Sequence, residues 1–219
     1  FSSKGNAAGW GDLTTARNHA GDMGNSTRCL SHDAIAPSNV TVDYITWATK
    51  GDAVDFGDAS VSRSQCGSGS STTRGYLYGG ATGPSEIASI DYFTIGSTGN
   101  ATDFGDISSG AQSNAQGGSS STRGVHGGGY NSSDQLVNII SYITIASTGD
   151  STDFGDLTVA RSDHAGASNG IRAGFFQGNG DQTTCDFVTI ATTGNAADFG
   201  DTTIVGRNAR AIAEGHGGL

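Results

Sequence analysis

The sequence predicts an all-β protein, a β-propeller of about five blades with roughly four antiparallel strands in each blade. Hydrophobic residues make up only 34% of the 219 residues, and there are 36 glycines. Such a composition suits many short strands joined by tight turns, and it does not suit helices around a large core. In addition, one short pattern recurs every 45 to 50 residues, which is the length of one propeller blade.

The recurring pattern is an aromatic residue followed by Gly and Asp. Its five copies begin at Trp10, Phe56, Phe104, Phe154 and Phe199. The triplet Asp-Phe-Gly also binds magnesium in protein kinases, but a kinase has one copy, with a strand lysine and a His-Arg-Asp loop. This chain has two lysines and no His-Arg-Asp. The repetition therefore indicates an architectural role.

Each repeat unit begins with a short aromatic and β-branched segment, which predicts a strand. These segments are 44–47, 92–95, 142–145 and 187–190, and Phe1 matches the last residue of a fifth. A Gly-Asn or Gly-Asp pair follows each segment and is a turn signal. These pairs begin at Gly5, Gly51, Gly99, Gly149 and Gly194.

The aromatic-Gly-Asp triplet comes next. We expect its aromatic ring to fill the space between adjacent blades, its Gly to let the backbone bend, and its Asp to cap the turn. A further strand is predicted over 157–161, followed by a segment rich in small residues, such as 164–167, near a crowded axis. The last strand of the unit begins with arginine and is rich in glycine, as at 74–80, 123–128 and 172–176.

All nine arginines fall into two columns of the repeat. The first column holds Arg17, Arg63, Arg161 and Arg207, with Ala111 in the third unit; the second holds Arg28, Arg74, Arg123, Arg172 and Arg210. Because the guanidinium group suits bidentate pairing with carboxylates, we expect an Asp–Arg pair in each blade. The expected structural residues are Asp58, Asp106, Asp156, Asp201, Arg74, Arg123, Arg161 and Arg172.

The pattern Tyr-Ile-Thr-Ile-x-x-Thr-Gly-Asp-x-x-Asp-Phe-Gly-Asp-Leu-Thr-x-x-Arg at 142–161, with Arg-Gly-x-x-Gly-Gly-Gly at 123–129, resembles the kelch-like repeats of marine bacteriophage virion proteins, those of cyanophages above all. The resemblance covers essentially the whole chain. It implies a virion structural protein at the particle surface or tail, such as a tail fiber component. The kelch Tyr and Trp at set distances after the glycines are not evident, which makes the chain a divergent relative.

The whole chain, 1–219, is expected to form a single propeller domain. Its repeat units are approximately 1–43, 44–91, 92–141, 142–186 and 187–219. One strand is missing from a complete set of five blades. Either a five-bladed ring closes imperfectly, or the sequence is a piece of a longer chain.

Composition excludes several classes of function. The formal net charge of −10 repels phosphate backbones, so nucleic-acid binding is not expected. No long apolar run is present, so membrane insertion is not expected. Cys29, Cys66 and Cys185 occupy different places in the repeat, which argues against a disulfide framework and a zinc site. No cofactor is expected.

Asp150, Asp153 and Asp156 stand three residues apart, and calcium binding is the alternative to turn capping for them. Asparagine replaces the first aspartate in two other units, and the spacing fits no EF-hand, so capping is favoured. The histidines form no column and no pair at metal spacing. Catalytic residues normally break the symmetry of a repeat, and no such break is evident, so no enzymatic activity is expected.

The segments between the Arg-Gly strand and the next aromatic strand differ most between units. Exposed, variable segments on a shared frame are where binding residues are usually found. The candidate binding residues there are His32, Glu86, Tyr130, Asn131, Phe176 and Asn179. We expect a non-enzymatic virion module for host recognition, contacting a host cell-surface glycan or protein, or other virion proteins. The alternative is a repeat lectin that binds sugars between blades, but a lectin needs like loops, and these loops differ.

Overall fold

The computed structural model describes residues 9–17, 21–32, 40–179 and 182–206. Within these ranges it contains strands and turns and no helix, and hence no helix that could cross a membrane. The strands form four antiparallel sheets of four strands each and two sheets of two strands. The all-β prediction and the number of strands per sheet are therefore confirmed.

The four large sheets follow one another along the chain. The first contains β1 (Asp22–Gly24), β2 (Arg28–His32), β3 (Thr41–Thr46) and β4 (Val54–Asp58). The second contains β5 (Gly67–Ser70), β6 (Arg74–Tyr78), β9 (Ser89–Thr94) and β10 (Thr102–Asp106). The third contains β12 (Gln116–Ser119), β13 (Arg123–Gly127), β15 (Ile139–Thr144) and β16 (Thr152–Asp156). The fourth contains β17 (Ala165–Ser168), β18 (Arg172–Phe176), β19 (Thr184–Thr189) and β20 (Ala197–Asp201).

The two small sheets lie between these elements. One pairs β7 (Ala81–Thr82) with β8 (Ser85–Glu86), and the other pairs β11 (Gln112–Ser113) with β14 (Tyr130–Asn131). β7, β8 and β14 lie in the variable segments that connect the second and third strands of a large sheet, whereas β11 precedes the third sheet. The segments at 81–86 and 130–136 are partly ordered hairpins.

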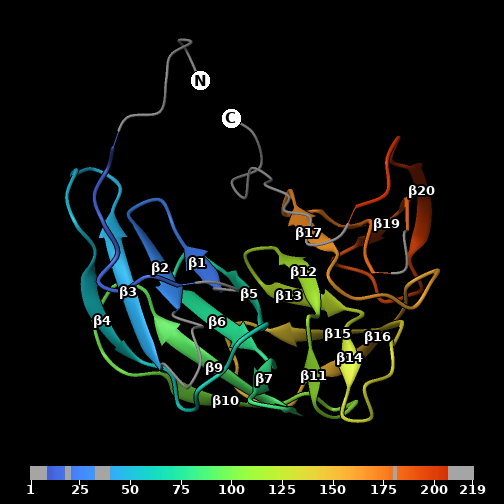
Figure 1. Ribbon diagram of the computed structural model, residues 1–219, viewed down its shortest axis with the longest axis horizontal. Coiled ribbons are helices and arrows are strands. Elements are labelled where there is room, and N and C mark those ends of the chain that lie inside the picture. The colour runs from blue at the N-terminus through green and yellow to red at the C-terminus, as the bar shows by residue number, and fades with distance from the viewer. Residues whose placement is uncertain (1–8, 18–20, 33–39, 180–181, 207–219) are drawn as a thin grey trace.

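The four large sheets lie side by side in an arc (Figure 1). The short strands β1, β5, β12 and β17, the last three rich in Gly, Ser and Ala, lie along the inside of the arc, and β4, β10, β16 and β20 lie along the outside. Small residues on the inner strands allow the sheets to converge there, as the sequence predicts. The fifth sheet that the sequence predicts is not among the described strands.

Two details of the predicted unit are wrong. Residues 157–161 do not form a strand, because they turn inward to bind the neighbouring strand β19 through Thr158 and Arg161. The Asp-Phe-Gly-Asp segment, expected to be a bend, is instead the outer strand of each sheet. Each sheet consequently spans one of the unit boundaries at 44, 92, 142 and 187.

A β-bulge lies at the aromatic residue of every outer strand. In the third sheet Ser141 pairs with Asp153 and Ile140 with Gly155, so that Phe154 is the extra residue. The same shift in register occurs in the other three sheets. A bulge re-aims a side chain, and in the first three sheets the aromatic ring joins the core between two sheets.

Three apolar clusters form the core, and each fills the space between two adjacent sheets. Phe56 packs with Phe93 and Ile95 of the second sheet, and Phe104 packs with Ile143 and Ile145 of the third. The third cluster joins Phe154 to the fourth sheet in the same way. The rings of these three phenylalanines are 2–3% exposed, so they fill the spaces between sheets, as predicted.

Candidate functional site

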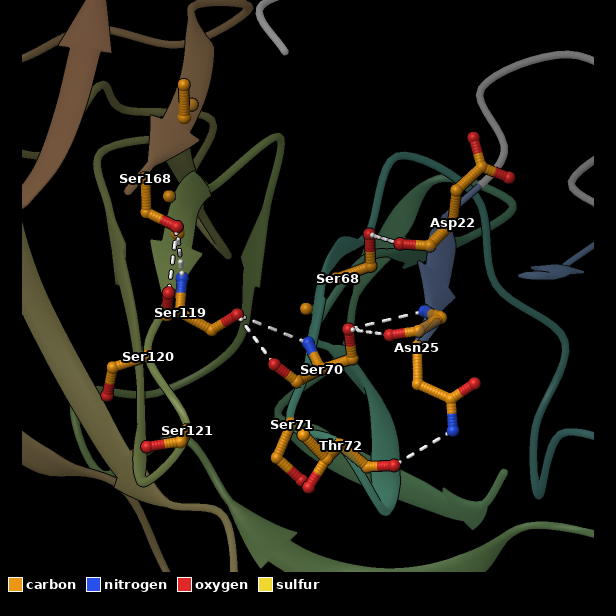
Figure 2. Close-up of a pocket in the computed structure, with 16 residues that line it drawn as sticks. Asp22, Asn25, Ser68, Ser70, Ser71, Thr72, Ser119, Ser120, Ser121 and Ser168 are labelled. Atoms are coloured by element: carbon orange, nitrogen blue, oxygen red, sulfur yellow. Dashed lines mark hydrogen bonds between the residues drawn. The ribbon is translucent and has the colours of Figure 1, made fainter. Parts of the chain in front are cut away.

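A cleft with a volume of about 450 Å³ opens on the inside of the arc. It is lined by residues of β1, β5, β12 and β17 and of the turns that follow β1, β5 and β12. Serine and glycine dominate the lining, and Asp22 is its one charged side chain. Figure 2 shows the lining side chains, several of which are hydrogen-bonded to the neighbouring sheet.

Three serines at matching positions join the inner strands into a ladder. The Ser70 hydroxyl donates to the Gly24 carbonyl at 2.7 Å, Ser119 donates to Ser70 at 2.9 Å, and Ser168 donates to Ser119 at 2.8 Å. Each hydroxyl also accepts a bond from the amide of the same partner residue. The polar groups that dominate the cleft are thus already used to hold the sheets together (Figure 2).

The outer ends of the sheets are joined by a second repeated set of bonds. The amides of Gly99 and Ala101 donate to the carbonyls of Phe56 and Asp58, at 2.8 and 2.7 Å. The Asp58 amide donates to Asn100 Oδ1 at 3.1 Å. The same three bonds recur at the other junctions. They join Gly51, Asp52 and Ala53 to Trp10 and Asp12, they join Gly149, Asp150 and Ser151 to Phe104 and Asp106, and they join Gly194, Asn195 and Ala196 to Phe154 and Asp156.

This geometry explains why Asn and Asp alternate after the turn glycine. Only the Oδ1 atom is used, as an acceptor from a backbone amide, and both side chains offer it. The glycine of the aromatic triplet is also required there. A Cβ atom on Gly57 would lie 2.4 Å from the Gly99 carbonyl oxygen, so any larger residue would push the two sheets apart.

The expected Asp–Arg pairing is correct in kind, but its aspartates are wrong. Arg161 Nη2 lies 2.7 Å from Asp186 Oδ2, and Arg63 Nη2 lies 2.9 Å from Asp91 Oδ2; these four side chains have no exposed surface. Arg17 pairs with Asp43 in the same manner. The partners are aspartates of the third strand of each sheet, and their side chains are fully buried.

None of the aspartates expected to pair belongs to these three ion pairs of the described residues. They are Asp58, Asp106, Asp156 and Asp201. They lie on the outer strands and are half-buried or exposed. Their backbone groups carry the bonds between sheets, except at Asp201, whose carboxylate accepts a bond from Thr183 Oγ1 at 2.9 Å.

The arginines of the second column have a different role from the one predicted. Arg28, Arg74, Arg123 and Arg172 each lie over an aromatic ring of their own sheet, 4.3–4.7 Å from the ring centroid. The rings are Tyr44, Tyr92, Tyr142 and Phe187. Three of the guanidinium groups also donate to a carbonyl of the next sheet; for example, Arg74 Nη1 donates to the Ile145 carbonyl at 2.9 Å. These arginines therefore connect sheets through cation–π contacts and carbonyl bonds.

The third unit breaks the symmetry of the repeat at two positions, of which only Ala111 was evident in the sequence columns. Where the other sheets have Arg and Asp, this unit has Ala111 and Ser141. Ser151 of the same sheet takes over part of the role, since its hydroxyl accepts the Ser108 amide bond at 3.0 Å. In the other units an aspartate carboxylate accepts the equivalent bond.

Buried aromatic and imidazole rings fill the core beside this unit. His126 stacks on Tyr78 at 4.6 Å between ring centroids, and its Nε2 lies 3.0 Å from the Tyr76 hydroxyl. Burial lowers the pKa of His126 to about 3, and burial together with the nearby Arg161 lowers that of His164 to about 3. Burial raises the pKa of Tyr78 to about 12, although Ser141 and Ser151 beside its hydroxyl act in the opposite direction. These groups are neutral at pH 7 and enclosed.

The six candidate binding residues fall into two groups. His32 is fully buried at the end of β2, and Glu86 is half-buried in β8, so neither is a freely displayed side chain. Asn131 forms a turn, because its Oδ1 accepts bonds from the amides of Ser133 and Gln135. For His32 and Asn131 the prediction mistook structural side chains for displayed ones.

The other three candidates lie at the ends of hairpins. Asn179 Nδ2 donates to the Tyr130 hydroxyl, which joins the connecting segments of the third and fourth sheets. Phe176 is half-buried at the end of β18 and lines a cavity of about 190 Å³ with Phe187 and Phe199. Tyr130 and Asn179 are thus brought together, whereas Phe176 lies in a separate cavity.

The structure does not bring Asp150, Asp153 and Asp156 together as a metal site. Asp150 Oδ1 accepts the Asp106 amide bond at 2.9 Å, across the junction with the second sheet. In the part of the chain that the structure describes, no group of three His, Cys, Asp or Glu side chains could hold a metal ion. Cys29, Cys66 and Cys185 are free thiols.

No protein-family model matches the chain, and no curated protein matches it either. The resemblance to kelch-like phage repeats therefore stays a prediction.

Proposed function

We propose that the chain is a non-enzymatic structural and adhesion module of a phage virion, a β-propeller of about five blades. Its frame positions unlike hairpins for recognition of a host surface or for contact with other virion proteins. The resemblance of the repeats to those of marine phage virion proteins supports the virion location, at the particle surface or tail.

The observation that carries the proposal is the contrast between a repeated frame and unrepeated hairpins. The serine ladder and the outer bonds occur with the same atoms from sheet to sheet. The connecting hairpins differ in sequence, length and turn: 81–86 closes through Gly83 and Pro84, whereas 130–136 is one residue longer and its turn is held by the Asn131 side chain. Unlike loops on a uniform frame are typical of recognition proteins.

These hairpins lie along the same edge of the arc. Figure 1 shows β7, β11 and β14 close together. The residue before each hairpin also donates to the segment that leads into the next sheet, since the Gly80 amide bonds to the Gln112 carbonyl and the Gly129 amide to the Arg161 carbonyl. Residues 82–85 and 132–136 are exposed there, and Leu136 presents an apolar side chain that is 38% exposed. Together they form an exposed surface that a partner could contact.

The test is to replace residues 82–85 and 132–136 with Gly-Ser linkers of equal length and to measure adsorption to a panel of marine cyanobacterial cells. A matched control replaces the exposed turn 108–110, which lies outside these hairpins. We expect the hairpin variants to lose adsorption, while the control retains it and all variants keep their melting temperatures. Equal adsorption by all variants would contradict the proposal.

A repeat lectin is the second candidate, and the Arg-over-aromatic pairs favour it because they recur in all four sheets. Glycan-array screening followed by titration separates the two functions. A stoichiometry of about one sugar per sheet supports the lectin, whereas one site that depends on the hairpins supports the adhesion module.

A further inference from the structure

The two end sheets of the arc expose side chains that are buried at every junction inside it. Phe199 is 69% exposed, whereas its equivalents Phe56, Phe104 and Phe154 are 2–3% exposed. At the other end Trp47 is 47% exposed, whereas its equivalents Ile95, Ile145 and Ile190 are at most 1% exposed. Both ends thus present faces that are built like junctions.

Within the arc, each unit from the turn glycine to the outer strand contacts two neighbouring sheets. The segment 99–106 shows both contacts: Gly99 and Ala101 donate to the preceding sheet at Phe56 and Asp58, and Phe104 and Asp106 accept from the following sheet. The distance from the turn glycine to the aromatic residue is five residues in every copy, and Gly5 to Trp10 has the same spacing.

The N-terminal copy of this unit has one of its two contacts in place. The carbonyls of Trp10 and Asp12 accept bonds from Gly51 and Ala53 of the first sheet, at 3.0 and 2.8 Å. Its other half is Gly5-Asn6-Ala7, which matches Gly99-Asn100-Ala101 residue for residue. Among the described residues, one aromatic-Gly-Asp triplet accepts no bond from a turn glycine, and this triplet is Phe199-Gly200-Asp201.

We propose that the segment from Phe1 to Ala7 binds the open face of the fourth sheet of its own chain and so connects the two ends of the arc. In this arrangement the amides of Gly5 and Ala7 donate to the carbonyls of Phe199 and Asp201, and Asn6 accepts from the Asp201 amide. The inference concerns how the frame closes and is independent of what the hairpins bind.

A second, separate match supports the same occupant. Phe1 stands four residues before Gly5, as Ile95, Ile145 and Ile190 stand before their turn glycines. At three junctions the carbonyl at this position accepts a bond from the second-column arginine of the preceding sheet. Arg172 is the remaining arginine of that column in the described part of the chain, and it lines the 190 Å³ cavity together with Phe176, Phe187 and Phe199. We therefore place the Phe1 ring in this cavity.

Disulfide trapping tests the arrangement. Cys29, Cys66 and Cys185 are replaced with alanine, and Asn6→Cys is combined with Asp201→Cys. The positive control is Asp58→Cys with Asn100→Cys, the equivalent pair at a junction seen in the structure. The negative control is Asn6→Cys with the exposed Ser109→Cys. Under mild oxidation we expect the test pair to lose both free thiols and run as a monomer, like the positive control.

Two outcomes would overturn the proposal. Disulfide-linked dimers would show that a second copy supplies the segment, and free thiols in the test pair beside a trapped positive control would show that the segment does not bind there. Hydrogen exchange of the unsubstituted chain gives a check that needs no cysteine variant. We expect amides in residues 5–12 to exchange at least about tenfold faster after Phe199→Asp, a change at a side chain that is exposed in the structure. Equal exchange in both proteins would also overturn the proposal.

Discussion

Three arginines of this protein lie buried against aspartates of the third strand, and the third unit lacks both members of the pair. The joint replacement by Ala111 and Ser141 has a simple physical reason. A buried guanidinium or carboxylate left alone costs several kcal/mol, whereas removing both charges together can be nearly neutral. Each unit is therefore expected to contain both the arginine and the aspartate, or neither.

The first prediction concerns this pair. Asp186→Ala should lower the free energy of unfolding by roughly 3–5 kcal/mol, because Arg161 would remain buried without its partner. Adding Arg161→Ala should recover part of the loss, so that the two effects are not additive. Urea denaturation measures both. Asp156→Ala is the matched control on the outer strand and should cost much less; strict additivity of Arg161→Ala and Asp186→Ala would contradict the pairing.

The second prediction concerns acid. Because the folded-state pKa values of His126 and His164 lie near 3, below the ordinary value of about 6.5, unfolding takes up protons. Stability should be complete above pH 6.5 and should fall below it by about 1.4 kcal/mol per pH unit for each histidine. Tyr76, Tyr78 and Arg161 are the other ionisable groups around these rings.

Melting temperatures measured between pH 7 and 4.5 test this, since carboxylates titrate mainly below that window. His126→Asn should give a shallower slope than the unsubstituted protein. An unchanged slope would show that the His126 ring is not the group that takes up the proton.

The bulged outer strand is the element that allows the sheets to approach each other. Its glycine has a positive φ in all four sheets, for example +138° at Gly105, and in the first three sheets it lies against the turn glycine of the next sheet. The bulge and the close approach are needed together, because the bulge brings the backbone to a position where a Cβ atom does not fit.

Gly105→Ala tests this element. The added Cβ would lie 2.6 Å from the Gly149 carbonyl oxygen, so we expect the free energy of unfolding to fall by about 1–3 kcal/mol. Gly96→Ala is the control, because a Cβ there meets open space and should leave stability nearly unchanged. Chemical denaturation compares the two, and equal small effects would argue against a tight junction.

Because each core cluster lies between two sheets, adjacent sheets stabilise each other across the whole molecule. Phe104→Ala should remove about 3–5 kcal/mol from a cluster that contains residues of both the second and the third sheet. Hydrogen exchange should then accelerate in both β9 and β15. Acceleration limited to one sheet would show that the sheets unfold independently.

How far the sequence predicts this structure depends on the range of the interaction. The small-residue inner strand and the strand that begins with arginine follow from local composition, and both are confirmed. The outer strand was missed because Gly and Asp are poor strand formers, and its bulge because it belongs to the pairing with the third strand, which local composition does not reveal. The partners of the buried arginines were missed because Asp186 lies 25 residues from Arg161; the joint loss at Ala111 and Ser141 was the signal that could have revealed them.

The serine ladder gives the assembly a direction. Each hydroxyl donates to the sheet before it, at intervals of 46, 49 and 49 residues, and the backbones of Ser70 and Ser119 receive the hydroxyl of the sheet after them. Such a contact is heterologous, joining the head of one unit to the tail of the next. A duplicated stretch of one unit length therefore brings both halves of a ready-made interface with it. Chains of this kind can gain or lose a sheet by gene duplication or deletion, because the added or remaining sheets already contain the residues of the contact.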